Sequence, residues 1–201
     1  MSERKQSTIK QSAQKLLSVV VPCFNSQAYM ERALDSLPVQ DGRLEILIVD
    51  DGSTDATREI ADGFQARYPD VCIAIHQENG GHGSAIMAGF AKATGLYFDV
   101  LDSDDWVDTA QYLNMLDTLE RTRDDPVDLL VRNTVYEKTA SRRRFVLHFR
   151  GILPREKVFS WAESKPFPLG NSASANAAPV SLPWSWKTKG WISYLTPAGN
   201  R

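Results

Sequence analysis

Three carboxylates lie within a single turn of chain at Asp102, Asp104 and Asp105. Like charges held this close raise one another's pKa and repel, unless a cation lies between them. A hard divalent ion such as Mg²⁺ or Mn²⁺ prefers oxygen ligands and commonly keeps positions open for substrate phosphates. The cluster therefore predicts a metal site; the alternative is a solvated helix N-terminus, where the helix dipole favours aspartate.

Two further polar segments could serve the same chemistry. Residues 50–55 (DDGSTD) follow an apolar run, and their carboxylates could accept from a base N–H or a ribose hydroxyl, or cap the next helix. Residues 77–84 (QENGGHGS) contain three glycines, which let backbone N–H groups approach a phosphate. Their histidine, His82, could contact substrate or hydrogen-bond within its own loop, and the residues leave both roles open.

Strands and helices that alternate along the chain would position these clusters. Apolar runs predict buried strands at 16–22, 44–49, 71–75, 96–101 and 127–131. Helical spacing predicts helices at 27–37, 56–64, 85–93 and 109–121. Ser26 is expected to cap the first of these helices, and Gly95 is expected to end the third. A β-ribbon is expected at 134–149. The alternation indicates a parallel α/β sheet with helices on both faces, and its carboxyl edge would carry every polar cluster.

Composition limits the class of protein. With 42% hydrophobic and 9% aromatic residues, the chain is not collagen-like or wholly disordered. No apolar run approaches the ~20 residues of a membrane helix, so a cytoplasmic protein is expected, with attachment to the inner membrane face left open. Residues 141–201 hold ten basic and two acidic side chains. Among them, Arg142, Arg143, Arg144 and Arg150 form one short basic stretch, which falls short of the sustained basic face typical of nucleic-acid binding. Cys23 and Cys72 lie in apolar runs and are expected to be buried.

Four segments in this order resemble the family 2 glycosyltransferases of GT-A fold: residues 19–26 (VVVPCFNS), 48–55 (IVDDGSTD), 79–83 (NGGHG) and 101–106 (LDSDDW). The resemblance spans about residues 16–165. It implies a Rossmann-type, mostly parallel sheet flanked by helices. It also implies transfer of a sugar, with inversion, from a nucleotide sugar, commonly a UDP-sugar, to an acceptor hydroxyl with Mg²⁺ or Mn²⁺. Polysaccharide biosynthesis, with a glycan or lipid-linked acceptor, is the expected setting.

The resemblance also implies roles for individual residues. Pro22 and Asn25 would form the floor of the nucleotide pocket, and Asp51 would read the uracil. Asp102 and Asp104 would be the DxD pair that contacts ribose and metal. The residues expected near the nucleotide, the donor sugar or the diphosphate are Asn79, Gly80, Gly81 and His82.

The chain departs from the family after the fourth motif. The family continues into an acceptor-binding half with a general-base Asp or Glu, yet the 38 residues after Glu163 contain no acid. Asp105, Glu156 and Glu163 are the remaining candidates for the base. The acceptor side is therefore expected to be incomplete, as in a truncated or frame-shifted copy. The alternative function is a remnant that binds nucleotide and metal without transfer.

Three segments follow from this pattern. Residues 1–15 are expected to form a mobile basic tail, and residues 16–165 a nucleotide-sugar-binding domain. Residues 166–201 are expected to form an irregular tail, with five of the ten prolines and three of the five tryptophans.

A phospho-acceptor or phosphatase role has less support, because Asp50 and Asp51 end the second strand instead of the first. The motifs do not specify the sugar, the acceptor or the oligomeric state.

Overall fold

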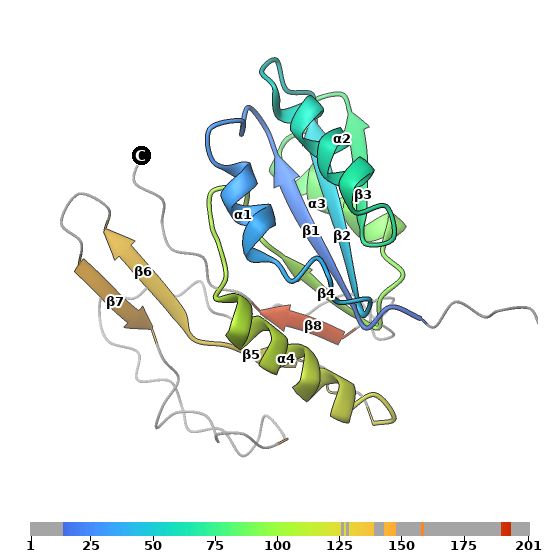
Figure 1. Cartoon of the computed structure of the whole chain (residues 1–201), viewed down its shortest axis with the longest axis vertical. Helices are drawn as coiled ribbons and strands as arrows, with labels where there is room; N and C mark the ends of the chain where they lie inside the picture. The colour runs from blue at the N-terminus through green and yellow to red at the C-terminus, as the bar shows by residue number, and fades with distance from the viewer. Residues whose placement is uncertain are drawn as a thin grey trace, which may run out of the picture.

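A computed structural model describes residues 14–125, 127, 129–138, 143–147, 158 and 190–193. Its main sheet has six strands in the order β3-β2-β1-β4-β8-β5, and every neighbouring pair is parallel (Figure 1). The strands of this sheet are β1 (Leu17–Cys23), β2 (Leu44–Asp51), β3 (Cys72–Gln77), β4 (Tyr97–Val100), β5 (Leu129–Val131) and β8 (Gly190–Ser193). The helices are α1 (Met30–Ser36), α2 (Thr57–Arg67), α3 (His82–Lys92) and α4 (Thr109–Arg121). The predicted parallel sheet is confirmed.

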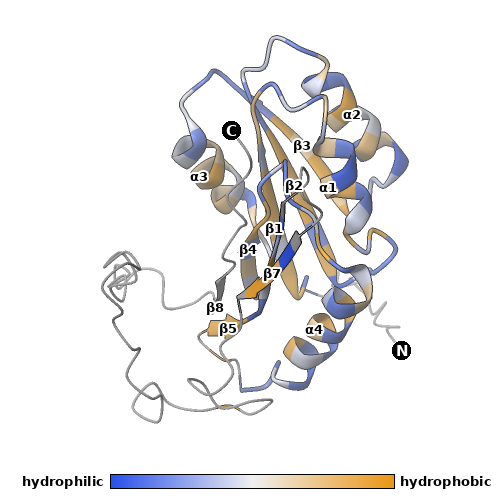
Figure 2. Ribbon diagram, turned by 90° about the vertical axis from the view of Figure 1, so that its left-hand side faces the viewer, coloured by the Kyte–Doolittle hydropathy of each residue, from blue (hydrophilic) through white to orange (hydrophobic). Residues whose placement is uncertain are grey.

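The helices cover both faces of the sheet. Figure 2 shows α3 on one side and α1, α2 and α4 on the other. Side chains alternate along each strand, so Val19 and Val21 of β1 face the larger helical layer while Val20 faces α3. Because both faces are covered, every residue of β1 and β2 is buried, and each large apolar side chain contributes about 1.5–3 kcal/mol.

Gly89 brings α3 unusually close to the sheet. A Cβ at this position would lie 2.5 Å from a methyl carbon of Val20, closer than two carbons can approach. The absence of a side chain therefore lets the backbone of α3 lie directly on β1, as in helix contacts that depend on small residues.

Two predicted helix boundaries were wrong because distant contacts replace local ones. Ser26 does not cap α1, since its Oγ accepts from the Phe24 N–H and lies 2.9 Å from Ser103 Oγ. Gly95 does not close α3 in a left-handed conformation. Its N–H donates to Ser18 Oγ, and a Cβ there would lie 2.6 Å from the Ser18 nitrogen. Helix α3 also begins three residues earlier than expected, at His82.

The ribbon and part of the C-terminal segment can be compared with expectation. Strands β6 (Thr134–Lys138) and β7 (Arg143–Leu147) pair in antiparallel fashion, which confirms the ribbon. Strand β8 lies within the segment 166–201 that was expected to be irregular, and it pairs with β4 and β5. Residues 1–13, Glu156 and Glu163 lie outside the described residues, so the expected division into domains stays a prediction.

Cys23 and Cys72 are both buried and free, as predicted. Burial and the charge of Asp50 raise the pKa of the Cys23 thiol to about 12, so this thiol stays protonated at neutral pH. Among the residues that the structure describes, no helix combines the length and the apolar composition that crossing a membrane would need.

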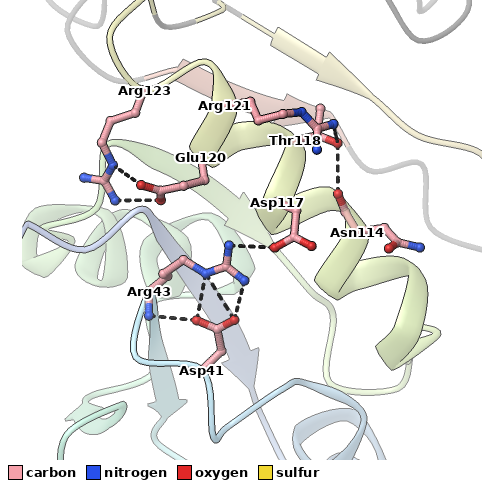
Figure 3. A network of polar contacts seen from close by, with 8 residues as sticks. All are labelled: Asp41, Arg43, Asn114, Asp117, Thr118, Glu120, Arg121 and Arg123. Atoms are coloured by element: carbon pink, nitrogen blue, oxygen red, sulfur yellow. Dashed lines mark hydrogen bonds and ion pairs between the residues drawn. The ribbon is translucent and has the colours of Figure 1, made fainter.

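Arg43 ties the loop before β2 to helix α4, at the amino edge of the sheet (Figure 3). Its guanidinium donates to both carboxylate oxygens of Asp41, at 2.9 Å and 2.6 Å, and to Asp117 of α4 at 2.8 Å. The hydrogen bonds from Arg43 hold the pKa of Asp41 below its usual value. A paired fork of this kind is more favourable than a single surface ion pair.

We expect Asp41→Asn to lower the free energy of unfolding by about 1–2 kcal/mol at pH 7. Because the folded-state pKa of Asp41 is lowered, its contribution is fully present above the ordinary carboxyl pKa of about 4 and is lost as pH falls through the lowered value. Urea unfolding of both proteins at several pH values measures this. A difference that stays constant down to the most acidic pH would contradict the ion-pair origin.

Candidate functional site

The strand register gathers the loops after β1, β2 and β3 at the carboxyl edge of the sheet. Cys23 is paired with Asp50, and Asp51 with Gln77, so β1, β2 and β3 end side by side. A cleft of about 350 Å³ opens there. Its lining residues come from the ends of β1 and β2, from the loop before α3 and from α3 itself: Pro22, Cys23, Phe24, Asp51, Asn79, Gly81, His82 and Ala85.

Asp51 organises the glycine-rich loop that borders the cleft. Its Oδ1 accepts from Gln77 Nε2 at 2.6 Å and from the Gly80 N–H at 2.9 Å, and its Oδ2 accepts from the Gly81 N–H at 2.8 Å. Burial opposes ionisation, but these hydrogen bonds outweigh it and lower the pKa of Asp51. Asp51 is therefore an ionised carboxylate that faces the cleft and fixes the loop before α3.

Gly52 brings the same two loops together. Its φ is +72°, and a Cβ there would lie 2.7 Å from the backbone nitrogen of Asn79. A residue with a side chain would therefore be strained and would also clash. The loop after β2 and the loop after β3 form one packed wall of the cleft as a result.

Asp50 serves the opposite face of the sheet from Asp51, because successive strand residues point in opposite directions. It is 2% exposed. Its Oδ1 accepts from the Ser53 N–H at 3.0 Å, and its Oδ2 lies 3.1 Å from Nδ1 of His76. The adjacent acids are thus explained by two separate sets of contacts, and neither caps α2.

Asn25 joins the loop after β1 to the loop after β2. Its N–H donates to Ser53 Oγ at 3.0 Å, and its amide oxygen accepts from the Thr54 N–H at 2.9 Å. Asn25 has a φ of +49° and is exposed, and it is not among the residues that line the cleft. The next two residues make further hydrogen bonds to the segment after β2: the Ser26 N–H donates to Thr57 Oγ1, and the Gln27 N–H donates to Asp55 Oδ2.

The acidic cluster follows β4, beside the cleft. Burial raises the pKa of Asp102, and Asp104 adds to this rise while His82 opposes it. Burial and the charges of Asp104 and Asp102 raise the pKa of Asp105 to about 7. His82 Nε2 lies 3.6 Å from Asp102 Oδ1, which links the cluster to the start of α3. The structure thus brings Asp102 and His82 together at the carboxyl edge, where the sequence predicted that the polar clusters would gather.

The three acids differ in exposure. Asp104 is exposed, Asp102 is half-buried, and Asp105 is buried. Within the described part of the chain, Asp105 Oδ2 is buried and has no hydrogen-bond partner. The same part holds no group of three His, Cys, Asp or Glu side chains that could bind a metal by themselves. Asp102 and Asp104 offer hard oxygen ligands, which fits an ion that takes its other ligands from water or a bound diphosphate.

Helix α1 and the loop before it hold the acidic cluster in place. Ser103, between Asp102 and Asp104, contacts Ser26 through their hydroxyl groups. The guanidinium of Arg32 lies 3.3 Å from the centre of the Trp106 ring, a cation–π contact. The Val107 N–H donates to the side chain of Ser36 at 3.1 Å. Sequence reasoning missed these contacts, because each joins residues more than 70 positions apart.

Phe24 is a further site residue that sequence reasoning did not single out. It is 49% exposed and lines the cleft. An aromatic ring left half-exposed at the edge of a polar cleft offers a flat surface on which a planar group can stack. In the sequence, the position of Phe24 two residues after Pro22, where the first predicted strand ends, could have indicated a residue of the site.

In a parallel α/β sheet, ligands bind in the crevice beyond the carboxyl ends of the strands, and the polar loops of this protein surround a cleft at that edge. Residues 18–176 match the family described as Glycosyl transferase family 2. The match covers most of the chain, and the chain belongs to this family. Its sheet flanked by helices agrees with the fold that the sequence motifs implied.

Curated relatives support this membership. The chain is 33% identical over 132 residues to the uncharacterized glycosyltransferase EpsJ of Bacillus subtilis (strain 168), which covers 65% of this chain and 37% of EpsJ. It is 35% identical over 140 residues to glycosyltransferase GlyG of Streptococcus pneumoniae serotype 4, which covers 68% of this chain and 44% of GlyG. The chain thus spans less than half the length of each relative.

Two solved structures resemble part of the chain. TarS of S. aureus, solved in complex with UDP-GlcNAc, is 25% identical, with a TM-score of 0.49 over 61% of this chain and 34% of that chain. The mannosyltransferase PcManGT of Pyrobaculum calidifontis, in complex with GDP-Man and Mn²⁺, is 23% identical, with a TM-score of 0.48 over 65% of this chain and 38% of that chain.

Proposed function

We propose that this chain binds a nucleotide sugar in the cleft and transfers the sugar, with inversion, to an acceptor hydroxyl. The observation that carries the proposal is the convergence of the loops after β1, β2, β3 and β4 on one edge of the sheet. A UDP-sugar is the proposed donor, because the four motifs resemble those of enzymes that commonly use one. Family membership supports sugar transfer as the reaction class.

The cleft offers complementary groups for a nucleoside. Phe24 provides a ring on which the base can stack, a contact worth about 1–3 kcal/mol for aromatic side chains and nucleobases. Asp51 already accepts three hydrogen bonds, and a carboxylate has about four acceptor positions, so one position is open to a base N–H. Pro22 also lines the cleft.

The other side of the cleft suits the diphosphate and the sugar. Helix α3 begins at His82, and the N–H groups of its first turn can donate to phosphate oxygens. We assign Asn79, Gly80 and Gly81 to the same region. His82 is exposed and can donate to the diphosphate, where its present contact with Asp102 holds it near the acidic cluster.

The proposed cofactor is Mg²⁺ or Mn²⁺, held by Asp104 and Asp102, with Asp102 also near the ribose. Such an ion neutralises the diphosphate leaving group, an effect worth several kcal/mol in the transition state. The raised pKa values of Asp102 and Asp105 support this assignment, because a cation would relieve the crowding of negative charge. Asp105, Glu156 and Glu163 stay the candidates for the general base.

Isothermal titration of UDP and GDP into the protein, with Mn²⁺ or with EDTA, tests the donor site. We expect UDP to bind in the presence of Mn²⁺ and to lose most of its affinity in EDTA. Equal affinity in EDTA would contradict the metal, and the absence of binding by either nucleotide would contradict the nucleotide site. Release of UDP from UDP-sugars, measured with and without acceptors, then separates transfer from binding alone.

A further inference from the structure

His76 of β3 lies between two carboxylates on the face of the sheet opposite Asp51. Its Nδ1 is 3.1 Å from Asp50 Oδ2, and its Nε2 is 3.0 Å from Asp62 Oδ1 on α2. His76 and Asp50 are paired across β3 and β2, so the strand register itself sets the first contact. Ionised carboxylates only accept hydrogen bonds, and a neutral imidazole carries one N–H, so the tautomer decides which carboxylate accepts from it; the Nδ1–H tautomer donates to the buried Asp50.

The contacts continue from His76 to a predicted nucleotide residue. Asp50 accepts from the Ser53 N–H through Oδ1, and Ser53 Oγ accepts from the Asn25 N–H. Every step is a hydrogen bond of 3.0 Å or 3.1 Å. His76 is therefore connected through two residues to the loop after β1, which carries Phe24 and Asn25, although it does not line the cleft itself.

We propose that His76 is a positioning residue for the nucleotide site: by holding the Asp50 carboxylate, it fixes the loop after β2 and, through Ser53, the loop after β1. Asp50 is 2% exposed, so it cannot exchange His76 for water at little cost. Without this donor the carboxylate has to turn or remain unsatisfied, and either response releases the Ser53 N–H. The proposal rests on the proposed function for its effect on nucleotide binding.

Two substitutions separate the contacts of the imidazole. The amide nitrogen of asparagine can take the place of Nδ1, so His76→Asn offers a donor to Asp50 and loses the contact with Asp62. The amide nitrogen of glutamine reaches the place of Nε2, so His76→Gln offers a donor to Asp62 and loses the contact with Asp50. Both variants remove the ring and one of its two contacts, which makes each the matched control of the other.

Titration of UDP with Mn²⁺ and hydrogen exchange of the Ser53 and Asn25 amides test the proposal. We expect His76→Asn to bind within about twofold of the parent protein, and His76→Gln to bind about tenfold more weakly. The Ser53 amide should exchange faster only in His76→Gln. Urea unfolding gives the free energy of unfolding of both variants, with which their UDP affinities are compared.

Equal affinity and equal amide exchange in the two variants, or affinities that follow the free energy of unfolding alone, would overturn the proposal. If the parent protein binds neither UDP nor GDP, the proposed function fails separately. The exchange of the Ser53 and Asn25 amides then decides the positioning role of His76 alone, because it is measured without a ligand.

Discussion

Asp104→Asn is expected to weaken Mn²⁺-dependent binding of UDP by about 100-fold or more, because it replaces an anionic oxygen ligand of the proposed ion by a neutral amide. Asp104 is the exposed member of the acidic cluster, so its substitution removes charge without opening a cavity. The effect on affinity should therefore exceed any effect on the free energy of unfolding. Titration of UDP in Mn²⁺ and in EDTA measures it, and the variant should resemble the parent protein in EDTA.

Asp108→Asn is the matched control for this prediction. Asp108 is an exposed aspartate four residues further on, and its side chain caps α4 by accepting from the Gln111 N–H at 3.0 Å. Asparagine is an equally good N-cap, so the substitution removes the same charge and keeps the helix. A similar loss of UDP affinity in both variants would indicate a general charge effect and would rule out Asp104 as a ligand.

Asp99→Ala is expected to lower the free energy of unfolding by about 3–5 kcal/mol, the cost of breaking a buried ion pair. Asp99 lies on β4 and is 2% exposed. Its Oδ2 accepts from Arg132 at 2.8 Å and from the Tyr112 hydroxyl of α4 at 2.9 Å. The truncation removes the carboxylate that both groups share, at a position that is itself buried. Urea unfolding at pH 7 measures the loss.

Two further variants separate the charge from the packing around Asp99. Tyr112→Phe removes one donor and keeps the ring, so it should cost only about 1 kcal/mol. Combining Asp99→Leu with Arg132→Met removes both charges, and the double variant should be less destabilised than the sum of its single substitutions. Additive losses in this cycle would contradict the ion pair as the origin of the effect.

The fold could be predicted because each strand carries its own signal. Residues 16–22 and 44–49 are apolar runs interrupted only by Ser18 and Glu45, as expected for strands buried on both faces, and helix 109–121 was predicted with its observed ends. Strand β8 gave no such signal. Four residues are too short to show a period, and its partners Tyr97 and Leu129 lie more than 60 positions away.

The sequence was sufficient to predict where the site lies, but it was not sufficient to predict the contacts that its residues make. The rule that ligands bind beyond the carboxyl ends of parallel strands correctly placed Asp51, Asn79 and His82 around one cleft. Whether Asp51 is open or already engaged depends on the loop 29 residues further on, whose N–H groups it accepts. In the same way, Ser26 has the composition of a helix cap, and only the arrival of Ser103 beside it explains its actual contact.

The close approach at Gly89 has a consequence for the cleft. Gly89 lies seven residues after His82, about 10 Å along the axis of the same helix. A helix of this length moves as one unit, so the contact between Gly89 and Val20 also sets the distance between the sheet and the N-terminal end of α3 at His82. The dimensions of the proposed phosphate region are therefore decided partly in the hydrophobic core. Gly89 therefore influences the shape of the cleft without lining it.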